Sequence, residues 1–593
     1  MNVSKNRITG KRSLLAFVMY FAMGFLQYYK PLLSENPVIA GAPTCYFSFR
    51  SFISMIASPF TWSEKLSIPT KGPSIFSLET ILSCALTPLS VILDLHPSKI
   101  VVMENVLATA FAGFTMYLLT QELLRKSIDN YREVISFLSS TMAGLIYIMN
   151  LTVFLHYSIY TGIKLAYSIF PLFVLFLIKT FHEKKFRELI ITGLLWVIVG
   201  ETAPRWFVGI VLFIGIFSLY HIILRILEAK TSIKREIPHM LKLVFLLVAI
   251  VVPLYSHYLI AFFTAKSDVS MTALTTDLIR VRFANVNALT LFTGRTLALI
   301  PPLYDLKEDL LTSIRLLISA FMVGLAVIKR NKYVAFFSML LVVSFLLGGA
   351  IFPEFHRWLV LYSPSPIKSL VGRAFSSIRL VEQYAWLSIS VLAAFSFYYV
   401  MNKLYCIDRG KILLKLFILS FIVLSTLSSW PIFTGDMGGK FAPTNIPKEI
   451  EDLLEWLARN DSYSKVIYVP EYYGIFQPYW RSNQPLDNFF EVASTRPTYF
   501  RRNNIFVHYG KYLVSLRYDS LLIRNQTEVL SDFLKALNIK YLILHNDIHQ
   551  LSKRVKDSIS FLNNSQRFKL VKNYGFIYVY ENRKHTSQFF HSF

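Results

Sequence analysis

Residues 412–439 read ILLKLFILSFIVLSTLSSWPIFTGDMGG, and this stretch decides how the chain is organised. Residues 412–430 are almost continuously apolar and long enough to cross about 30 Å of hydrocarbon as an α-helix. Trp430 closes this run, and the glycines that follow open a linker. The stretch therefore predicts a boundary between a membrane-embedded part, residues 1–433, and a soluble part, residues 434–593.

The composition of the whole chain is that of a membrane protein. Of its 593 residues, 54% are hydrophobic and 16% are charged, with a mean hydropathy of +0.47. A soluble domain carries about 25% charged residues, so the composition excludes a water-soluble enzyme. The cysteines, Cys45, Cys84 and Cys406, are too few and too scattered for a disulfide framework or a zinc site.

Apolar stretches recur along the chain on the N-terminal side of residue 412. They predict eleven transmembrane helices, at about residues 13–33, 100–124, 134–154, 158–180, 187–200, 206–227, 241–263, 310–328, 333–352, 380–402 and 412–430. A twelfth stretch, residues 75–94, carries Glu79 and is interrupted by Pro88. Its hydropathy alone does not decide whether it crosses the membrane.

Basic residues resolve this ambiguity, because Lys and Arg accumulate in short cytoplasmic loops. If residues 75–94 lie on the membrane within a first outer loop, residues 34–99, every basic cluster falls on one side. The clusters are Lys5, Arg7, Lys11, Arg12; Arg125, Lys126, Arg132; Lys184, Lys185, Arg187; Lys230, Lys234, Arg235; Lys329, Arg330, Lys332; and Lys403, Arg409, Lys411. This predicts a multi-pass cell-membrane protein with a cytoplasmic N-terminus, an uncleaved signal anchor and an extracytoplasmic C-terminal domain. Much of the net charge of +25 is then an orientation signal, and no nucleic-acid partner is expected.

The soluble part reads as an α/β domain. A helix is expected to begin at Asn445 and Pro447, and a second helix near residues 527–537. Strands are expected at KVIYVP (465–470), YLILH (541–545), FKLVK (568–572) and FIYVYE (576–581), the last two joined by a turn at Asn573, Tyr574 and Gly575.

Polar residues are costly in a membrane protein and so mark function, and the informative ones gather on the predicted outer side. The acids are Glu35 and Glu64 in the first outer loop and Glu201 between two spans; the bases are Arg205, His356, Arg357, Arg373 and Arg379. The arginines could bind a phosphate or diphosphate through bidentate hydrogen bonds. The competing interpretations are a structural Glu201–Arg205 ion pair, an interfacial charge at Glu35, and an interfacial belt at His356 and Arg357.

Short sequence motifs give little further information about function. The sequence contains no GxxxxGK[ST] loop, no HExxH and no GxSxG, so ATP-driven transport and zinc proteolysis by those motifs have no support. The α/β domain has no glycine-rich turn after its strands and is not expected to bind a nucleotide. Three sequons on the predicted outer side, at Asn150, Asn525 and Asn563, are weak glycosylation signals.

Several segments carry a family resemblance. They are Phe111–Leu124 (FAGFTMYLLTQELL), Ala143–Tyr147 (AGLIY), Ala166–Leu172 (AYSIFPL), Gly372–Phe375 with Tyr384 and Ala385, Asn538–Ile543 (NIKYLI) and Val579–Asn582 (VYEN). With the layout of one span, a long outer loop, many further spans and an outer soluble domain, they resemble the GT-C superfamily of integral-membrane glycosyltransferases. The group that these segments resemble includes the YfhO-type membrane proteins and the large membrane arabinofuranosyltransferases.

The resemblance implies a chemistry. In that superfamily an acidic residue of the first outer loop acts as general base or binds a metal, and the donor is usually a polyprenyl-phosphate sugar. Glu35 holds this position, with Glu64 and Glu79 as alternatives and Glu201 as a second acid. The cofactor stays open, a divalent metal being one option. The loop has no Asp-Asp or Asp-x-Asp pair, and Ala42 stands where relatives often place an Asp; the WWDYG signature of oligosaccharyltransferases is also missing.

The sequence therefore predicts a polytopic α-helical membrane protein of GT-C type with an extracytoplasmic α/β domain. Its expected function is glycosyl transfer in the cell envelope, from a polyprenyl-phosphate-linked donor to a glycan, lipid or protein acceptor at the outer face. Its expected partners are membrane lipids and that donor. The alternative is a non-catalytic lipid or glycan flippase or cell-envelope assembly factor with the same fold. A third interpretation, a binding or scaffold protein, predicts that residues 440–593 alone retain activity.

Overall fold

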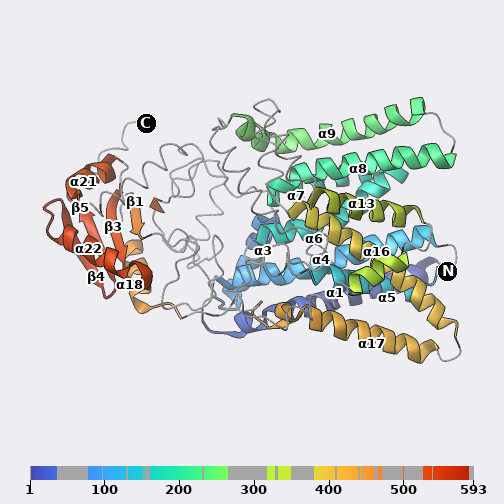
Figure 1. Cartoon of the computed structure of the whole chain (residues 1–593), viewed down its shortest axis with the longest axis horizontal. Coiled ribbons are helices and arrows are strands. Elements are labelled where there is room, and N and C mark those ends of the chain that lie inside the picture. The colour runs from blue at the N-terminus through green and yellow to red at the C-terminus, as the bar shows by residue number, and fades with distance from the viewer. Residues whose placement is uncertain are drawn as a thin grey trace. The chain divides into compact units, whose positions relative to one another are not determined.

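The structure is a computed structural model of the chain. It describes residues 2–36, 78–96, 98–128, 131–150, 154, 161–183, 185–229, 233–264, 317–326, 331–348, 379–407, 410–437, 441, 443, 445–459, 465–470, 498–499, 522, 525–536 and 539–585. These residues belong to two compact units (Figure 1). The membrane unit comprises residues 1–28, 76–79 and 104–438, and the sheet unit comprises residues 29–75, 80–103 and 439–593.

Long helices dominate the first 430 residues, as the apolar stretches predict. They are α1 (Asn2–Leu33), α3 (Leu78–Ile92), α4 (Ser98–Ser127), α5 (Glu133–Ile148), α6 (Thr161–Glu183), α7 (Phe186–Thr202), α8 (Pro204–Ala229), α9 (Ile233–Thr264), α13 (Lys332–Gly348), α16 (Arg379–Tyr405) and α17 (Gly410–Ser428). In the described residues, five helical segments are long and apolar enough to cross a membrane, within α4, α6, α8, α16 and α17. The count of eleven crossings stays a prediction.

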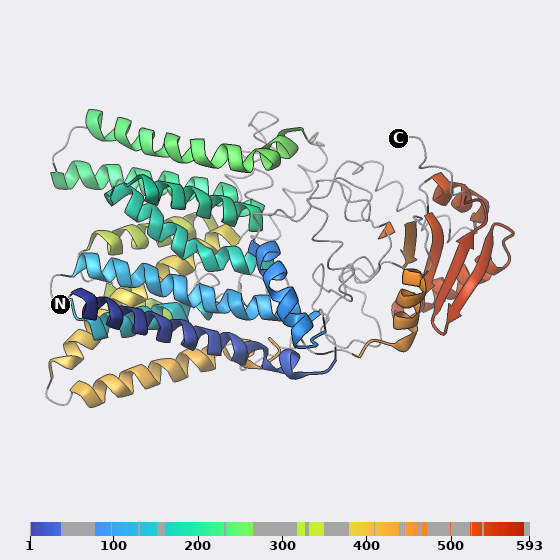
Figure 2. The ribbon, with the colours of Figure 1, turned by 180° about the vertical axis from the view of Figure 1, so that it is seen from behind.

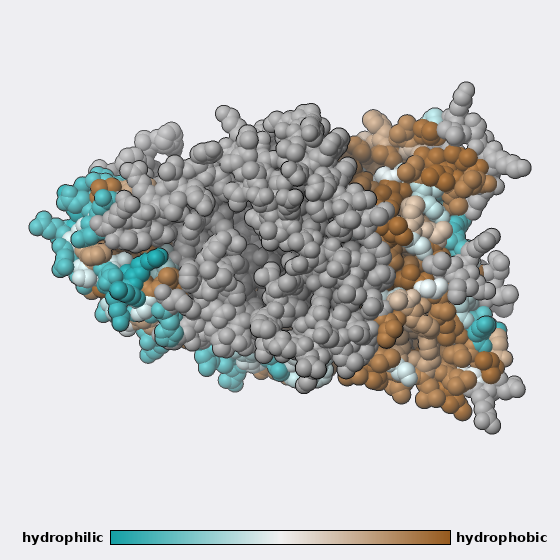
Figure 3. Space-filling model, in the orientation of Figure 1, coloured by the Kyte–Doolittle hydropathy of each residue, from teal (hydrophilic) through white to brown (hydrophobic). Residues whose placement is uncertain are grey.

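The helices differ in what their side chains contact. α16 packs against α5 and α13 and is almost entirely buried, whereas α17 and α8 leave large apolar residues such as Leu416, Leu419 and Leu219 exposed. The apolar surface of the membrane unit appears brown in Figure 3. Because exposed apolar side chains of this number are unfavourable in water, α8 and α17 have the surface expected of lipid-facing helices.

Glycines in two of the resemblance segments explain how α1, α4 and α5 approach closely. A Cβ at Gly113 would lie 2.5 Å from a ring carbon of Tyr20, and a Cβ at Gly144 would overlap the Tyr20 hydroxyl and lie 2.6 Å from the Gly113 carbonyl. The Tyr20 hydroxyl donates to the carbonyl of Thr141, 2.9 Å away. Figure 2 shows α1 and α4 side by side. Small residues at such contacts are the usual device by which membrane helices pack.

Several described basic residues of the membrane unit lie at one end of its helices. Arg12 pairs with Glu133 at 3.0 Å, and Lys126 with Glu183 at 3.5 Å. The guanidinium of Arg132 lies over the ring of Tyr405, and Asn331 donates to the carbonyl of Ser127. We call this the basic end; it also carries Lys185, Lys332 and Lys403. Since α6 reaches the basic end at Glu183, its first residue, Thr161, lies toward the opposite end.

The sheet unit contains a five-stranded sheet of order β2-β1-β3-β5-β4. The strands are β1 (Lys465–Val469), β2 (Thr498–Tyr499), β3 (Ile539–His545), β4 (Phe568–Tyr574) and β5 (Ile577–Asn582). β1 is parallel to β2 and β3, whereas β5 is antiparallel to β3 and β4. Gly575 adopts a φ of 65° in the β4–β5 turn, the left-handed conformation that glycine favours.

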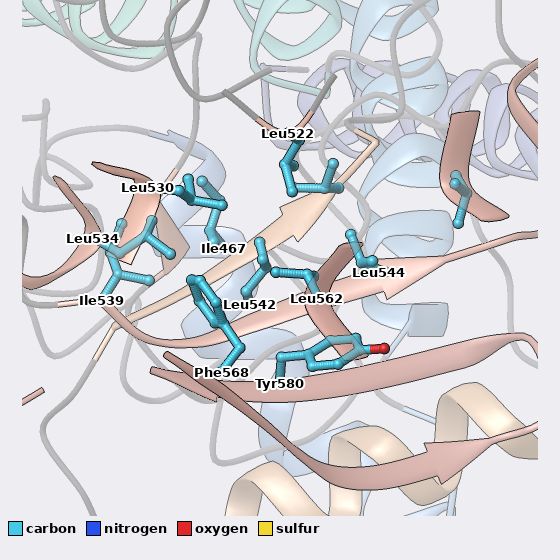
Figure 4. Packing of buried hydrophobic residues seen from close by; sticks show 12 residues of the cluster. Ile467, Leu522, Leu530, Leu534, Ile539, Leu542, Leu544, Leu562, Phe568 and Tyr580 are labelled. Atoms are coloured by element: carbon cyan, nitrogen blue, oxygen red, sulfur yellow. The ribbon is translucent and has the colours of Figure 1, made fainter. Parts of the chain in front are cut away.

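Alternating side chains give the sheet two apolar faces. Val466, Ile543 and Val579 pack on one face against α18 (Lys448–Arg459). Ile467, Leu542 and Tyr580 face the other way, toward α21 (Thr527–Ala536) and α22 (Ser552–Asn563), as Figure 4 shows for this cluster. The two-residue period predicted β1, β3, β4 and β5. β2 and α22 were not predicted.

Candidate functional site

Glu35 is the second residue after the end of α1, and its side chain is exposed. Lys99, the second residue of α4, reaches back to the end of α1. Its ammonium donates to the carbonyl of Leu32, 3.4 Å away, and to that of Ser34, and it interacts electrostatically with Glu35. The carboxylate therefore stands beside a buried cation, accessible to a hydroxyl or a metal ion.

His96 lies in the turn that leads into α4, close to Lys99. Its Nδ1 accepts a hydrogen bond from the Ser98 backbone N–H at 3.2 Å and contacts the Ser98 hydroxyl at 2.8 Å. Burial lowers the pKa of His96 below its ordinary value, and the charge of Lys99 lowers it further. The imidazole caps the start of α4, and the Lys99 backbone N–H donates to the His96 carbonyl at 2.9 Å.

Sequence reasoning missed Lys164, which is fully buried in the first turn of α6. Its ammonium donates to the hydroxyl of Tyr28 and lies 4.6 Å from the centre of the Tyr28 ring and 4.7 Å from that of Phe154. Tyr28 departs from helical geometry three residues before Pro31, which removes a helical hydrogen bond. The sequence did contain a sign of this site, a single lysine inside an apolar span, because charged residues within membrane spans are rare and are mostly functional.

Further buried polar groups connect α1, α4 and α6 near Lys164. The Thr109 hydroxyl donates to the Gln27 side-chain oxygen at 3.0 Å, and the Asn105 amide donates to the Thr161 hydroxyl at 3.2 Å. Glu104 is also fully buried. Sequence reasoning missed Glu104 too, although an acid within a predicted span was visible in the sequence.

An aromatic chain links the Lys164 cluster to the start of α8. The Tyr147 and Tyr167 rings stack with centroids 4.1 Å apart, and each hydroxyl donates to the other residue's carbonyl. Tyr167 also contacts Phe154, which lies under Lys164, and Trp206. Two resemblance segments, AGLIY and AYSIFPL, thus meet at this stack.

Glu201 lies one residue before the end of α7 and is buried, with 1% of its surface exposed. Arg205 is the second residue of α8, and the Trp206 N–H donates to the Ala203 carbonyl at 2.8 Å, which closes the turn between the helices. The structure describes only the backbone of Arg205. The expected Glu201–Arg205 pair therefore stays a prediction, and both residues lie close to Trp206 in the chain.

Most of the other site residues expected from the sequence cannot be placed in the structure. Glu64, His356, Arg357 and Arg373 lie outside the described residues, and Arg379 is described only as the first residue of α16. Glu35 falls in the sheet unit and Glu201 in the membrane unit. Within the described part of the chain, no three His, Cys, Asp or Glu side chains gather as metal ligands.

The sequons also differ in their surroundings. Asn150 is fully buried, and its amide donates to the Tyr167 hydroxyl at 3.3 Å, so this amide is inaccessible to a glycan in the folded chain. Asn525 is exposed just before α21, with a φ of 56°. Asn563 is exposed at the end of α22 and accepts a hydrogen bond from Tyr580. Asn525 and Asn563 stay glycosylation proposals.

Comparison with known proteins identifies the architecture. The structure resembles arabinofuranosyltransferase AftD from Mycobacteria, with a TM-score of 0.57 at 13% identity, over 96% of this chain and 40% of that one. A mutant form of AftD gives a TM-score of 0.57 at 14% identity, over 97% and 42%. The chain has the GT-C fold.

A third solved structure and the searches by sequence were also compared with this chain. The archaeal oligosaccharyltransferase AglB from Archaeoglobus fulgidus, solved with an inhibitory peptide and a dolichol-phosphate, gives a TM-score of 0.48 at 13% identity, over 90% of this chain and 69% of that one. No family model matches the chain, and no curated protein matches it. The GT-C fold of this chain spans about two-fifths of the length of AftD.

Proposed function

We propose that this protein is a membrane glycosyltransferase that transfers a sugar from a polyprenyl-phosphate-linked donor to a glycan, lipid or protein acceptor at the outer face. The observation that carries the proposal is the GT-C fold over nearly the whole chain, with an exposed acid, Glu35, two residues after its first helix. AftD, which shares this fold, is an arabinofuranosyltransferase.

Glu35 would act as the general base. Its carboxylate takes the proton of the acceptor hydroxyl while the hydroxyl oxygen forms a bond to the anomeric carbon of the sugar. The bond between that carbon and the donor phosphate breaks, and the polyprenyl phosphate leaves with the electron pair. Lys99 would hold Glu35 at the end of α1. A divalent metal at Glu35 would instead polarise the phosphate, and either role requires this carboxylate.

Cations would stabilise the departing phosphate. We assign this role to Arg205, His356, Arg357, Arg373 and Arg379, with Glu64 and Glu201 as further acids. We add Lys164 to the proposed set, because the contacts Phe154–Tyr167 and Tyr167–Trp206 link it to the residue that follows Arg205. Lys164 and Glu201 both lie toward the end of the membrane unit away from the basic end.

The proposed topology has eleven crossings, a cytoplasmic N-terminus, a membrane-lying segment at residues 75–94 and an extracytoplasmic sheet domain. It is supported by the ion pairs that gather Arg12 and Lys126 at the basic end. With this topology the donor and acceptor meet in the cell envelope, where lipid-linked sugars are consumed.

The alternative is a flippase or assembly factor with the same fold. A flippase needs polar groups along a path across the bilayer. Glu104, Lys164 and Glu201 instead all lie near one end of their helices. This distribution favours chemistry at one face of the membrane over transport.

The test replaces Glu35 by Gln and measures surface glycans in cells that carry only the variant. We expect the glycan product to fall at least about 100-fold, the usual contribution of a general base. Glu455→Gln is the matched control, because it is the same substitution at a glutamate whose side chain is 60% exposed on α18. Unchanged glycans in the Glu35 variant, at normal protein level, would remove Glu35 from this role and favour the non-catalytic alternative.

A further inference from the structure

A closed ring of buried polar residues joins α1, α4 and α6 in the membrane unit. Side-chain hydrogen bonds connect α1 to α4, α4 to α6 and α6 back to α1. On each helix the members are neighbours in the chain or lie about one turn apart, so the contacts close on themselves. We call this set the polar ring, and all its members are fully buried: Gln27, Tyr28, Asn105, Thr109, Thr161 and Lys164.

The side-chain amide of Gln27 is satisfied on one side only. Its oxygen accepts a hydrogen bond from the Thr109 hydroxyl at 3.0 Å. Its nitrogen carries two N–H groups, and neither has a hydrogen-bond acceptor among the residues that the structure describes. Because the side chain is fully buried, bulk water does not take the place of an acceptor. A buried donor without an acceptor is unfavourable, so a ligand oxygen that accepts from Gln27 would bind favourably.

The ammonium of Lys164 has no counter-charge in the described part of the chain. Its contacts are the Tyr28 hydroxyl and the rings of Tyr28 and Phe154, which are all neutral groups. The buried acid Glu104, one residue before Asn105 on α4, forms no ion pair with it. Lys164 also lies in the first turn of α6, where the helix dipole favours anions over cations. A buried cation in this place requires a negatively charged ligand to balance it.

Packing of the helices explains only part of the polar ring. Polar side chains commonly join membrane helices by hydrogen bonds without binding any ligand. That role accounts for the hydroxyl of Thr109 and the amide of Asn105, which donate to residues on neighbouring helices. It does not account for the Gln27 nitrogen or the Lys164 charge, because the described residues offer no acceptor to the first and no ion pair to the second.

We propose that the polar ring is a phosphate-binding subsite in which Gln27 and Lys164 hold the phosphate of a polyprenyl phosphate. The Lys164 ammonium pairs with one phosphate oxygen and the Gln27 amide donates to another, at the positive end of α6. The identity of the lipid rests on the proposed function, whereas the need for an oxyanion rests on the ring itself. Gln27 is then a substrate-binding residue of the first membrane helix.

The helix α1 is the wall of the ring through which a phosphate would enter. All members of the ring are buried, so entry requires one wall to move. The helical hydrogen bonding of α1 is interrupted here, because Tyr28 departs from helical geometry and Pro31 has no N–H for the carbonyl of Gln27. α1 is therefore the wall that moves most easily.

The experiment measures equilibrium binding of a radiolabelled polyprenyl phosphate, without a sugar, to the purified full-length protein in detergent. Gln27→Met keeps the length of the side chain and removes both N–H groups. We expect it to raise the Kd about tenfold, the effect of one lost hydrogen bond to a charged group. Gln27→Glu should raise the Kd further, because a carboxylate repels the phosphate. The melting temperature should stay unchanged in Gln27→Met, since the Thr109 hydroxyl can donate to the Asn105 carbonyl, 3.0 Å away, instead.

The matched control is Gln121→Met, which removes a half-buried amide from α4 toward the basic end. It should leave the Kd unchanged, and an equal rise in this variant would overturn the proposal. An unchanged Kd in both Gln27 variants would also overturn it. A separate arm adds inorganic phosphate. If free phosphate raises the melting temperature of the unmodified protein but not of Gln27→Met, and the polyprenyl phosphate does not bind, the ligand is a soluble anion instead.

The binding assay contains no acceptor, so its outcome is independent of glycosyl transfer. Weaker binding in the Gln27 variants, together with normal surface glycans in cells that carry Glu35→Gln, would support the phosphate subsite and contradict transfer by Glu35. Normal binding in the Gln27 variants, together with lost glycans in Glu35→Gln cells, would refute the subsite alone.

Discussion

Lys164 is a residue at which substitution is expected to affect stability and activity in opposite directions. A buried ammonium has lost its hydration, and here the Tyr28 hydroxyl and the Tyr28 and Phe154 rings replace only part of it. Because an unpaired buried charge is costly, an apolar residue of similar volume in its place should not destabilise the fold. The proposed phosphate ligand would explain why a cation is kept here at such a cost.

We expect Lys164→Met to retain or raise the melting temperature of the protein while lowering glycan product at least about tenfold, the factor that corresponds to about 1.4 kcal/mol of transition-state stabilisation. Both quantities are measured on the same preparation, the first by thermal unfolding in detergent. Lys179→Met serves as control on the same helix, since Lys179 is half-buried toward the basic end. Normal product from the Lys164 variant would contradict a role in phosphate binding.

The sequence showed some of these residues and hid others for physical reasons. Glu35 was visible because it follows an apolar run directly. Lys164 and Glu104 were averaged into the hydropathy of about twenty neighbours, so the helices α4 and α6 were predicted and the charges inside them were overlooked. Lys99 could not be assigned, because its contact with the end of α1 depends on how two segments 65 residues apart fold together.

At the scale of elements, the contact of α1, α4 and α5 around Tyr20 makes a sharp prediction. Gly144→Ala places a methyl group against the Tyr20 hydroxyl and the Gly113 carbonyl, and overpacking of this kind costs about 1–3 kcal/mol. We expect a lower melting temperature and a lower yield of folded protein. Gly215→Ala on α8 is the control, because nothing lies within 4 Å of its added Cβ. Equal melting temperatures for the two variants would show that α1 is not packed as described.

The sequence predicted those helices and strands whose apolar residues follow one regular pattern. Apolar length predicted the membrane helices, and alternation predicted β1, β3, β4 and β5. β2 is only two residues long, too short to show a period. α22 buries only Val555, Ser558 and Leu562 and is otherwise polar, so its helical period was weak. The packing order of the strands could not be predicted, because it depends on contacts between distant segments.

At the scale of the whole molecule, native and introduced cysteines can test the topology. Cys406 is exposed at the basic end, and Lys569 is exposed on β4 of the sheet unit. In a chain carrying Cys45→Ser and Cys84→Ser, a membrane-impermeant maleimide should label Cys406 only after the cells are permeabilised. With Cys406→Ser and Lys569→Cys added, intact cells should be labelled. The opposite pattern would reverse the orientation, and the same pattern at both positions would contradict an odd number of crossings between Cys406 and Lys569.

The edge strand of the sheet affects how neighbouring copies in the same membrane can associate. β4 is the last strand in the sheet order, and it exposes Lys569 and Lys572. Proteins anchored in one bilayer share an orientation and meet at high two-dimensional concentration, conditions under which open strands join into continuous sheets. Repulsion between the lysines of two such strands opposes this joining. The copies can therefore crowd together without aggregating through their sheets.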